Sequence, residues 1–248
     1  MIPFRFSSLL LSALVALPLA AQAHPRYTVT IVGAPGSTAT GINKTGAVIG
    51  NFSFAATVTH GFVNTGGVIT DLGTLPDGLQ SFARGINDSG VIVGDATNAD
   101  GFTRAFRYEA GTMVDLGTLG GDTSRAAAIN NRGDIAGSAE IPLDEFVQMR
   151  AFLLRPGVAM QDLGRIEVPN PEGSSHGYDV NDSRKVVGGS VVGPFDPPES
   201  PFHAFLYACE EMKDLGTLGG QYSVASARNA KGVVVGETST PDFHYNRA

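Results

Sequence analysis

The sequence predicts an all-β protein built from a repeated unit, and three recurring markers carry this prediction. The tripeptide Asp-Leu-Gly occurs four times along the chain. An Asn with a Ser six residues before it and a Gly seven residues after it occurs five times. A His or Arg followed by a small residue and Phe occurs four times, always in the same order relative to the other two markers. A period of about 44–52 residues is typical of the blades of β-propellers.

The three sets of markers are the structural residues of the predicted repeat. They are Asp71, Asp115, Asp162 and Asp214; Asn43, Asn87, Asn130, Asn181 and Asn229; and Phe62, Phe106, Phe152 and Phe205.

Each unit contains four short segments that read as β-strands, as the residues around Asn87 illustrate. The first strand has the pattern Ser-x-Ala-x-x-Ile-Asn at 81–87, and the second is rich in Val and Ile and ends at Gly94. The third begins at the marker 104–106, and the fourth leads into Asp115. Apolar residues alternate with polar or small ones, as in half-buried strands, and no segment shows a convincing helical period.

The connections within a unit predict two tight hairpins. Asn87-Asp88-Ser89-Gly90 favours a type I turn that Gly closes in a left-handed conformation, so the first and second strands pair. Ala110-Gly111 is a short loop between the third and fourth strands, which therefore also pair.

We therefore expect a β-propeller-like array of about five four-stranded repeats, with the last one incomplete. Ser and Ala suit a crowded axis, so the first strand is expected innermost and the fourth outermost. The segment Tyr27–Val32 reads as a fourth-type strand that would pair with the last unit in a closed ring. A β-solenoid or an open repeat array is the alternative fold. The fifth unit stops at Arg247-Ala248, two residues into the third marker, which predicts a fragment or truncated product of a longer protein.

The first 23 residues have the features of an export signal. Arg5 provides a positive start, residues 9–19 are apolar, and Ala21-Gln22-Ala23 has the small-x-small pattern of a cleavage site. The repeat domain is then 24–248, with units of approximately 27–70, 71–114, 115–161, 162–213 and 214–248, the last truncated. The expected location is extracellular or periplasmic.

Composition argues against several classes of partner. The formal net charge is −7, and removing Arg5 with the signal makes the mature chain more acidic, whereas nucleic acids and anionic membranes attract basic patches. No second apolar stretch is long enough to span a bilayer. The single cysteine, Cys209, leaves no internal disulfide, and no metal-binding or phosphate-binding motif occurs, so we predict no metal and no cofactor.

The repeats resemble the HAF family of probable extracellular repeat proteins, named for its His-Ala-Phe tripeptide. His203-Ala204-Phe205, the Asp-Leu-Gly-Thr-Leu-Gly-Gly runs from Asp115 and Asp214, and the Ile-Asn-x-x-Gly turns carry the resemblance, which covers nearly all of the mature chain. Arg104 and Arg150 depart from the family's His, and the chain lacks the Trp that often follows Phe. The resemblance implies export but no particular activity.

Loop lengths indicate where a partner binds. The spacing from Asn to Gly is seven in all five units, whereas the spacings from Asp to Asn and from Gly to His or Arg vary. Variation is therefore confined to the connections from the fourth strand to the next first strand and from the second strand to the third. In an up-and-down meander these lie on one face, which we interpret as a binding face. Harmless drift of surface loops is the alternative.

The unit around Asn181 is the least regular, and its loops 168–176 and 194–202 are stiffened by proline. The candidate binding residues lie in and beside these loops: Glu172, His176, Tyr178, Asp179, Phe195, Asp196, Glu199 and Phe202. Solvated surface loops are again the alternative.

No catalytic residue is assigned. His176 and Asp179 could form an acid–base pair, but residues three apart on a regular strand point to opposite faces. The recurring aspartates are expected to accept local backbone hydrogen bonds at strand ends rather than to ring a cation. The predicted function is an exported, non-enzymatic repeat protein that binds a protein or a glycan through its variable face. The alternative is a propeller-type glycosidase or lyase with an axial site, so the question of enzymatic activity is left open.

Overall fold

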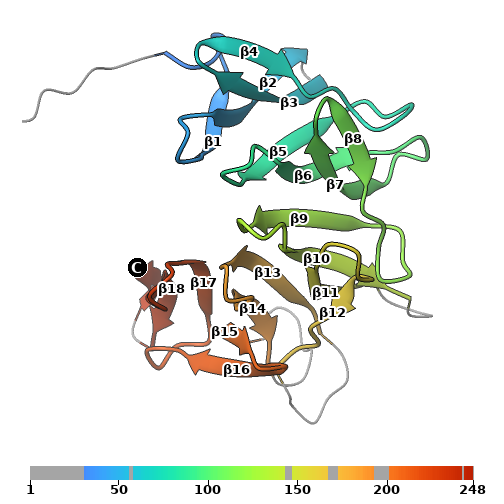
Figure 1. Cartoon of the computed structure of the whole chain (residues 1–248). Helices are drawn as coiled ribbons and strands as arrows, with labels where there is room; N and C mark the ends of the chain where they lie inside the picture. Colours follow the sequence, from blue (N-terminus) through green and yellow to red (C-terminus); the bar gives the residue numbers. More distant parts are fainter. Residues whose placement is uncertain are drawn as a thin grey trace, which may run out of the picture. The chain divides into compact units, whose positions relative to one another are not determined.

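The computed structural model describes residues 31–55, 58–142, 147–166, 173–192, 201–241 and 243–247, with the side chains of 54, 55 and 243–247 left out. All of the fold discussed below belongs to the unit from Val32 to Ala248. In these ranges nineteen strands form five antiparallel sheets and no helix occurs (Figure 1). Within them there is accordingly no apolar helix of the length needed to cross a membrane.

The sheets are numbered here in chain order. Sheet 1 consists of β1 (Thr38–Ile42), β2 (Val48–Ala55), β3 (Val58–Thr65) and β4 (Val68–Asp71), and sheet 2 of β5 (Ser81–Ile86), β6 (Ile92–Thr97), β7 (Thr103–Glu109) and β8 (Thr112–Asp115). Sheet 3 consists of β9 (Ser124–Ile129), β10 (Ile135–Ile141), β11 (Gln148–Leu154) and β12 (Gln161–Asp162), and sheet 4 of β13 (Ser175–Val180), β14 (Val186–Val191), β15 (Phe202–Ala208) and β16 (Glu211–Gly216). Sheet 5 consists of β17 (Ser223–Arg228), β18 (Val234–Thr240) and β19 (Phe243–Arg247).

The predicted all-β repeat is confirmed. Each sheet takes its strands from one continuous stretch of chain, so the colours in Figure 1 change sheet by sheet, and strands adjacent in sequence are adjacent in the sheet. Four sheets have four described strands and the fifth has three. The short third strand of sheet 5 places Arg247 opposite Thr238, as β15 places His203 opposite Ser190, so Arg247 occupies the position of the third marker.

The described strands form no closed barrel or propeller. The strongest contacts between strands of different sheets all join consecutive sheets, and none joins sheet 1 to sheet 5. The first strand of each sheet packs against the first strand of the next, from β1 through β5, β9 and β13 to β17, as expected of the innermost strand. Residues 27–30 of the predicted closing strand lie outside the described residues.

The third marker and the glycine of the second strand form the core of each sheet. Phe62, Phe106, Phe152 and Phe205 are at most 1 % exposed. Each ring lies against the glycine that follows the marker Asn by seven residues: a Cβ on Gly188 would lie 2.8 Å from the ring of Phe205 and 1.9 Å from the carbonyl oxygen of His176. The glycine is therefore required by close packing of a ring and a neighbouring strand.

The marker serine joins one sheet to the next. The Oγ of Ser124, which is fully buried, accepts a hydrogen bond from Ala105 N at 2.9 Å and donates one to Gly117 O at 2.6 Å. Ser81, Ser175 and Ser223 make the same pair of contacts with the sheet before them. Because the hydroxyl satisfies two buried backbone groups at once, a small hydroxyl side chain is needed at this position.

The marker asparagine closes the turn after the first strand and also reaches the next sheet. In sheet 2 the Oδ1 of Asn87 accepts hydrogen bonds from Ser89 N and Val91 N, and its Nδ2 donates to Asn130 O at 3.2 Å. Asn43 and Asn130 donate in the same way to Asn87 O and Asn181 O. The amides form a ladder across the first four sheets. In sheet 4 Arg184, with φ of 59°, takes the left-handed turn position that Gly holds in the other units.

Every first strand contains a β-bulge, which the residue pattern does not predict. The register with the second strand shifts at the same place in all five sheets, three residues after the marker Ser, for example between Gly177 and Asp179. The residues left unpaired are Thr40, Arg84, Ala127, Tyr178 and Ser226. A bulge interrupts the alternation of side chains and re-aims the unpaired residue.

Candidate functional site

A row of aromatic side chains runs from the first strand of sheet 4 to the start of sheet 5. The rings of Tyr178 and His176 are stacked, with centroids 6.3 Å apart and an interplanar angle of 14°. The ring of His176 lies 6.3 Å from that of Phe202, which in turn stacks on Tyr222 at 6.0 Å and 20°. Tyr178 is 37 % exposed, so the row begins at a ring that solvent reaches.

The backbone fixes the position of each ring in the row. His176 is the second residue of β13, and Tyr178 is the bulged residue of the same strand. Phe202 begins β15, and it forms an isolated parallel bridge with Tyr222, with Phe202 N donating to Gln221 O at 2.9 Å. The row therefore stands at the end of the sheets where the connections vary in length.

Beside the row lies a cavity of about 310 Å³ that three consecutive first strands line. Arg84 comes from β5, Arg125 from β9, and His176 and Tyr178 from β13, while Ser138 contributes its hydroxyl from β10. Apart from Ser138, the polar walls are thus made by the bulged residue, or by the residue two before it, in each of three units.

The two arginines differ in their partners. Arg84 Nε forms an ion pair with Asp95, which is 4 % exposed, so the charge of Arg84 is balanced within sheet 2. Arg125 is exposed, and the described residues provide no hydrogen-bond or ion-pair partner for its guanidinium group. The charge of Arg125 nevertheless affects the pKa of His176. Burial first, and then the charge of Arg125, lower the pKa of His176 from its usual 6.5, and its Nδ1 lies 3.2 Å from the Oγ of Ser138.

His176 and Asp179 do not form an acid–base pair. One carboxylate oxygen of Asp179 accepts a hydrogen bond from Arg228 N at 2.8 Å and the other from Val180 N at 2.9 Å. Burial raises the pKa of Asp179, and these hydrogen bonds oppose the shift. The two side chains do not follow the simple alternation expected of a regular strand, because the bulge at Tyr178 lies between them. The two residues have different partners: His176 contacts Ser138 in sheet 3, and Asp179 contacts Arg228 in sheet 5.

The predicted binding residues divide into three groups. His176, Tyr178 and Phe202 come together in the aromatic row, and Asp179 serves the contact with sheet 5. Glu172, Phe195, Asp196 and Glu199 lie outside the described residues. Sequence reasoning missed Arg84, Arg125, Ser138 and Tyr222. The two arginines could have been found as bulky residues between the marker Ser and the marker Asn, where other units carry small or neutral ones.

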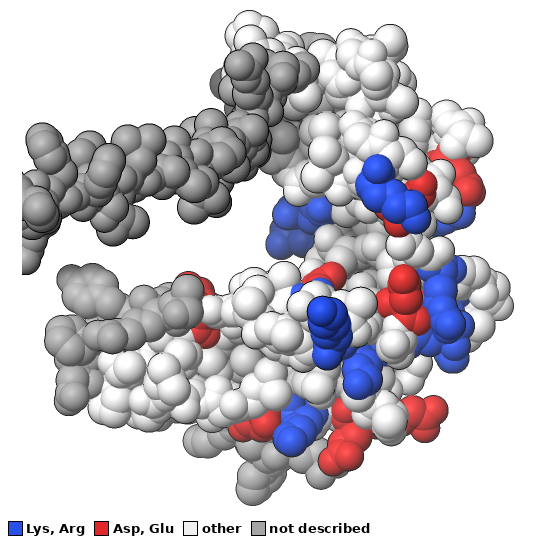
Figure 2. All heavy atoms as spheres, turned by 60° about the vertical axis from the view of Figure 1, so that its left-hand side comes forward, with Lys and Arg blue, Asp and Glu red and all other residues white. Residues whose placement is uncertain are grey.

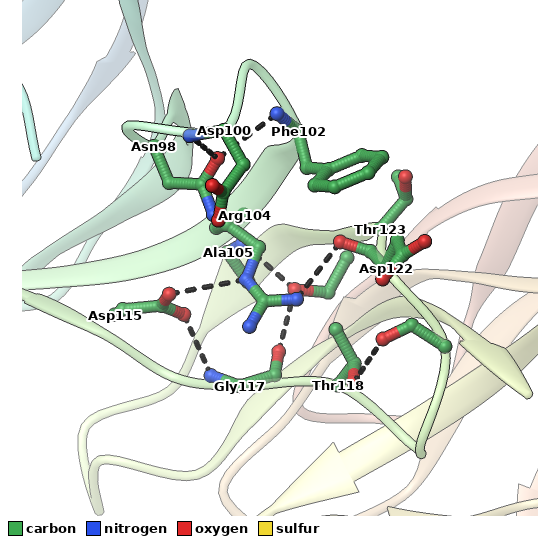
Figure 3. A network of polar contacts seen from close by, with 12 residues as sticks. Asn98, Asp100, Phe102, Arg104, Ala105, Asp115, Gly117, Thr118, Asp122 and Thr123 are labelled. Atoms are coloured by element: carbon green, nitrogen blue, oxygen red, sulfur yellow. Dashed lines mark hydrogen bonds and ion pairs between the residues drawn. The ribbon is translucent and has the colours of Figure 1, made fainter. Parts of the chain in front are cut away.

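The recurring charged markers serve the repeat itself. Figure 3 shows the network in sheet 2, where Arg104 Nε donates to Asp115 Oδ2 at 3.1 Å and Arg104 Nη1 donates to Asp122 O at 2.8 Å. The other oxygen of Asp115 accepts a hydrogen bond from Gly117 N at 2.8 Å. The predicted local hydrogen bond from the N–H of the glycine two residues on is present at all four aspartates: Asp71, Asp115, Asp162 and Asp214. His60 and His203 pair with Asp71 and Asp214 as Arg104 pairs with Asp115.

Comparisons with protein-family models, with curated proteins and with solved structures find no match to this chain. The resemblance to the HAF family therefore rests on the motifs alone.

A second cavity, of about 540 Å³, lies among the constant turns at the other end of sheets 2 and 3. Its walls include Arg107, Glu109, Arg132 and Arg155, and Arg107 is paired with Glu109 at 2.6 Å. None of the described residues that line it is aromatic. On the face drawn in Figure 2, acidic and basic side chains are interspersed rather than gathered by sign. We therefore take the smaller cavity beside the aromatic row as the candidate site.

Proposed function

We propose that this chain is an exported, non-enzymatic repeat protein of the HAF type that binds a glycan. In this proposal the five successive sheets form a propeller-like array, and the ligand binds at the end where the connections vary in length. The observation that carries the proposal is the row Tyr178–His176–Phe202–Tyr222 beside a cavity with polar walls.

Stacked aromatic rings with polar groups at their edge match the chemistry of a sugar. The C–H faces of a pyranose ring are apolar and cover an aromatic ring, while its hydroxyl groups need hydrogen-bond partners around the rim. Tyr178 offers the exposed ring, and Ser138 and His176 offer groups that donate or accept. A protein partner would more usually need a larger apolar surface, so the row favours a glycan over a protein.

Binding to a glycan array, followed by calorimetry on the best ligands, tests this proposal. Replacing Tyr178 by Ala removes the exposed ring and should weaken binding about tenfold, which corresponds to about 1.4 kcal/mol. Phe102→Ala is the matched control, because Phe102 is 40 % exposed and stands in a variable connection of sheet 2, away from the row.

Two outcomes would decide against the proposal. Equal losses in the two variants, or binding that neither affects, would show that the row is not the site. Release of shortened or unsaturated sugars during incubation would instead favour the alternative of a glycosidase or lyase. None of the described residues that line the cavity is acidic, whereas glycosidases generally need two carboxyl groups.

A further inference from the structure

The candidate cavity has a charge opposite to that of the chain. Its described lining contains two arginines, one histidine and no acidic residue, although the chain as a whole has a formal net charge of −7. Asp95 balances Arg84, so the unbalanced charge of the lining is that of Arg125. A cavity of this sign attracts an anionic group and repels cations.

Arg125 is placed to use that charge on a ligand. It occupies the position in β9 that His176 occupies in β13, so the two side chains stand on neighbouring first strands and line the same cavity. Its guanidinium group is exposed and has no partner among the described residues, so a ligand would not have to displace an existing ion pair. A guanidinium group binds a carboxylate through two parallel hydrogen bonds, which fixes orientation as well as charge.

We infer that the ligand is an oligosaccharide containing uronic acid, held with one sugar ring on Tyr178 and the carboxylate of that sugar on Arg125. This inference rests on the proposed glycan binding and specifies the class of glycan. The cavity volume of about 310 Å³ is at the small end of ligand cavities, so it takes one sugar unit while neighbouring units follow the rings of His176, Phe202 and Tyr222.

His176 contributes as a neutral group. Because burial and the charge of Arg125 lower its pKa, the imidazole stays uncharged near neutral pH and can hydrogen-bond a sugar hydroxyl without competing for the carboxylate. Arg125 is thus the only cation among the described lining residues that no ion pair balances, which makes its removal a specific test.

The test uses oligogalacturonate, oligomannuronate and hyaluronan oligosaccharides, each also in a carboxyl-reduced, neutral form. The full mature chain should bind at least one acidic oligosaccharide at least tenfold more tightly than its reduced form, and added salt should weaken only the former. Arg125→Gln should remove this preference, and Arg125→Lys should restore part of it. Arg132→Gln is the matched control, because Arg132 is exposed in the turn after β9 but does not line this cavity.

The outcomes separate this inference from the proposal beneath it. Equal binding of acidic and reduced forms, lost in Tyr178→Ala but not in Arg125→Gln, would overturn the uronate inference and leave glycan binding standing. Failure of the folded protein to bind any of the three acidic oligosaccharides would also overturn the inference, whereas glycan binding would fall only if the wider array were negative as well. Circular dichroism of each variant confirms that the comparison is between folded proteins.

Discussion

His176 shows how one residue can depart from its repeat and acquire a new environment. The same position carries Thr38, Phe82, Arg125 and Val224 in the other units, so nothing in the fold requires an imidazole there. In sheet 4 the ring is enclosed by Tyr178 and Phe202 and lies near Arg125, and both burial and that charge disfavour its protonation. Its ionisation is therefore coupled to folding.

The sign of this coupling predicts a loss of stability in acid. The pKa of His176 is lower in the folded protein than in the unfolded chain, so below about pH 6.5 the unfolded chain binds more protons at this residue. The free energy of unfolding should fall as the pH drops from about 6.5 through the lowered pKa, and His176 should contribute no pH dependence above that range. Urea denaturation between pH 7.5 and 5 measures the free energy of unfolding of the wild type and of His176→Gln. The free energy of the wild type should fall more steeply on acidification than that of the variant, so the difference between the two proteins should narrow. Parallel pH profiles would contradict the assignment.

At the scale of the elements, the turn after the first strand in sheets 1, 2 and 3 has two separable tasks, which are to close the turn and to bind the next sheet. Asn87 and Asn98 close the same kind of turn, since each accepts backbone hydrogen bonds from residues two and four positions later through Oδ1. Only Asn87 also donates through Nδ2 to the next sheet, at Asn130 O. A comparison of Asn87 with Asn98 therefore separates the stabilisation that comes from the turn from the stabilisation that comes from the hydrogen bond between sheets.

Replacing each of these asparagines by Asp should separate the two tasks. Asp keeps the acceptor that closes the turn but removes the amide donor, and in Asn87→Asp it places a carboxylate against a buried carbonyl. Because Asn87 is 5 % exposed, Asn87→Asp should cost about 2–3 kcal/mol, whereas Asn98→Asp should cost less than about 0.5 kcal/mol. Chemical denaturation of both variants measures these costs. Similar values would mean that the ladder of amides adds little to the cohesion of the sheets.

Regular features of the elements could be predicted from the sequence, and irregular ones could not. The strands follow from the alternation of residues, and the two hairpins per unit follow from Asn-x-x-Gly and from Ala-Gly. The small Ser and Ala residues of the first strand predict that it lies innermost, and the first strands of consecutive sheets do pack against one another. The bulge could not be foreseen, because the small side chains of Ala126 and Ala127 suit a regular strand as well as a bulged one. Arg184 occupies a left-handed position that its residue type does not indicate, and Tyr222 joins the site only through its bridge to Phe202.

At the scale of the whole molecule, stability depends on each sheet being covered by the next. The residue before the marker glycine of the second strand is fully buried in four sheets, as Ile49, Val93, Ala136 and Val187. In sheet 5 the corresponding residue, Val235, is 57 % exposed. Equivalent positions in different sheets should therefore contribute different amounts to the free energy of unfolding.

The same Val→Ala substitution, made at a buried and at an exposed position, measures this difference in stability. Val187→Ala removes two methylene equivalents from a closed core and should lower the free energy of unfolding by about 2 kcal/mol. Val235→Ala, at the equivalent exposed position, should lower it by less than about 0.5 kcal/mol. Equal losses in urea denaturation would show that the face of sheet 5 is covered in solution, and size-exclusion chromatography across concentrations would then identify self-association.

The joints between sheets have a further consequence, for the number of units that such a chain can carry. At successive boundaries, the marker Ser Oγ and the marker Asn Nδ2 form hydrogen bonds with equivalent backbone groups of the neighbouring unit. The contacts between one pair of units are therefore repeated between the next pair. A gene that gained or lost one whole period would recreate an existing joint rather than require a new one. The number of units can thus change by whole periods without altering the joints, and the connections between joints can differ in length, since the same Asn-to-Asn joint spans 44, 43 and 51 residues.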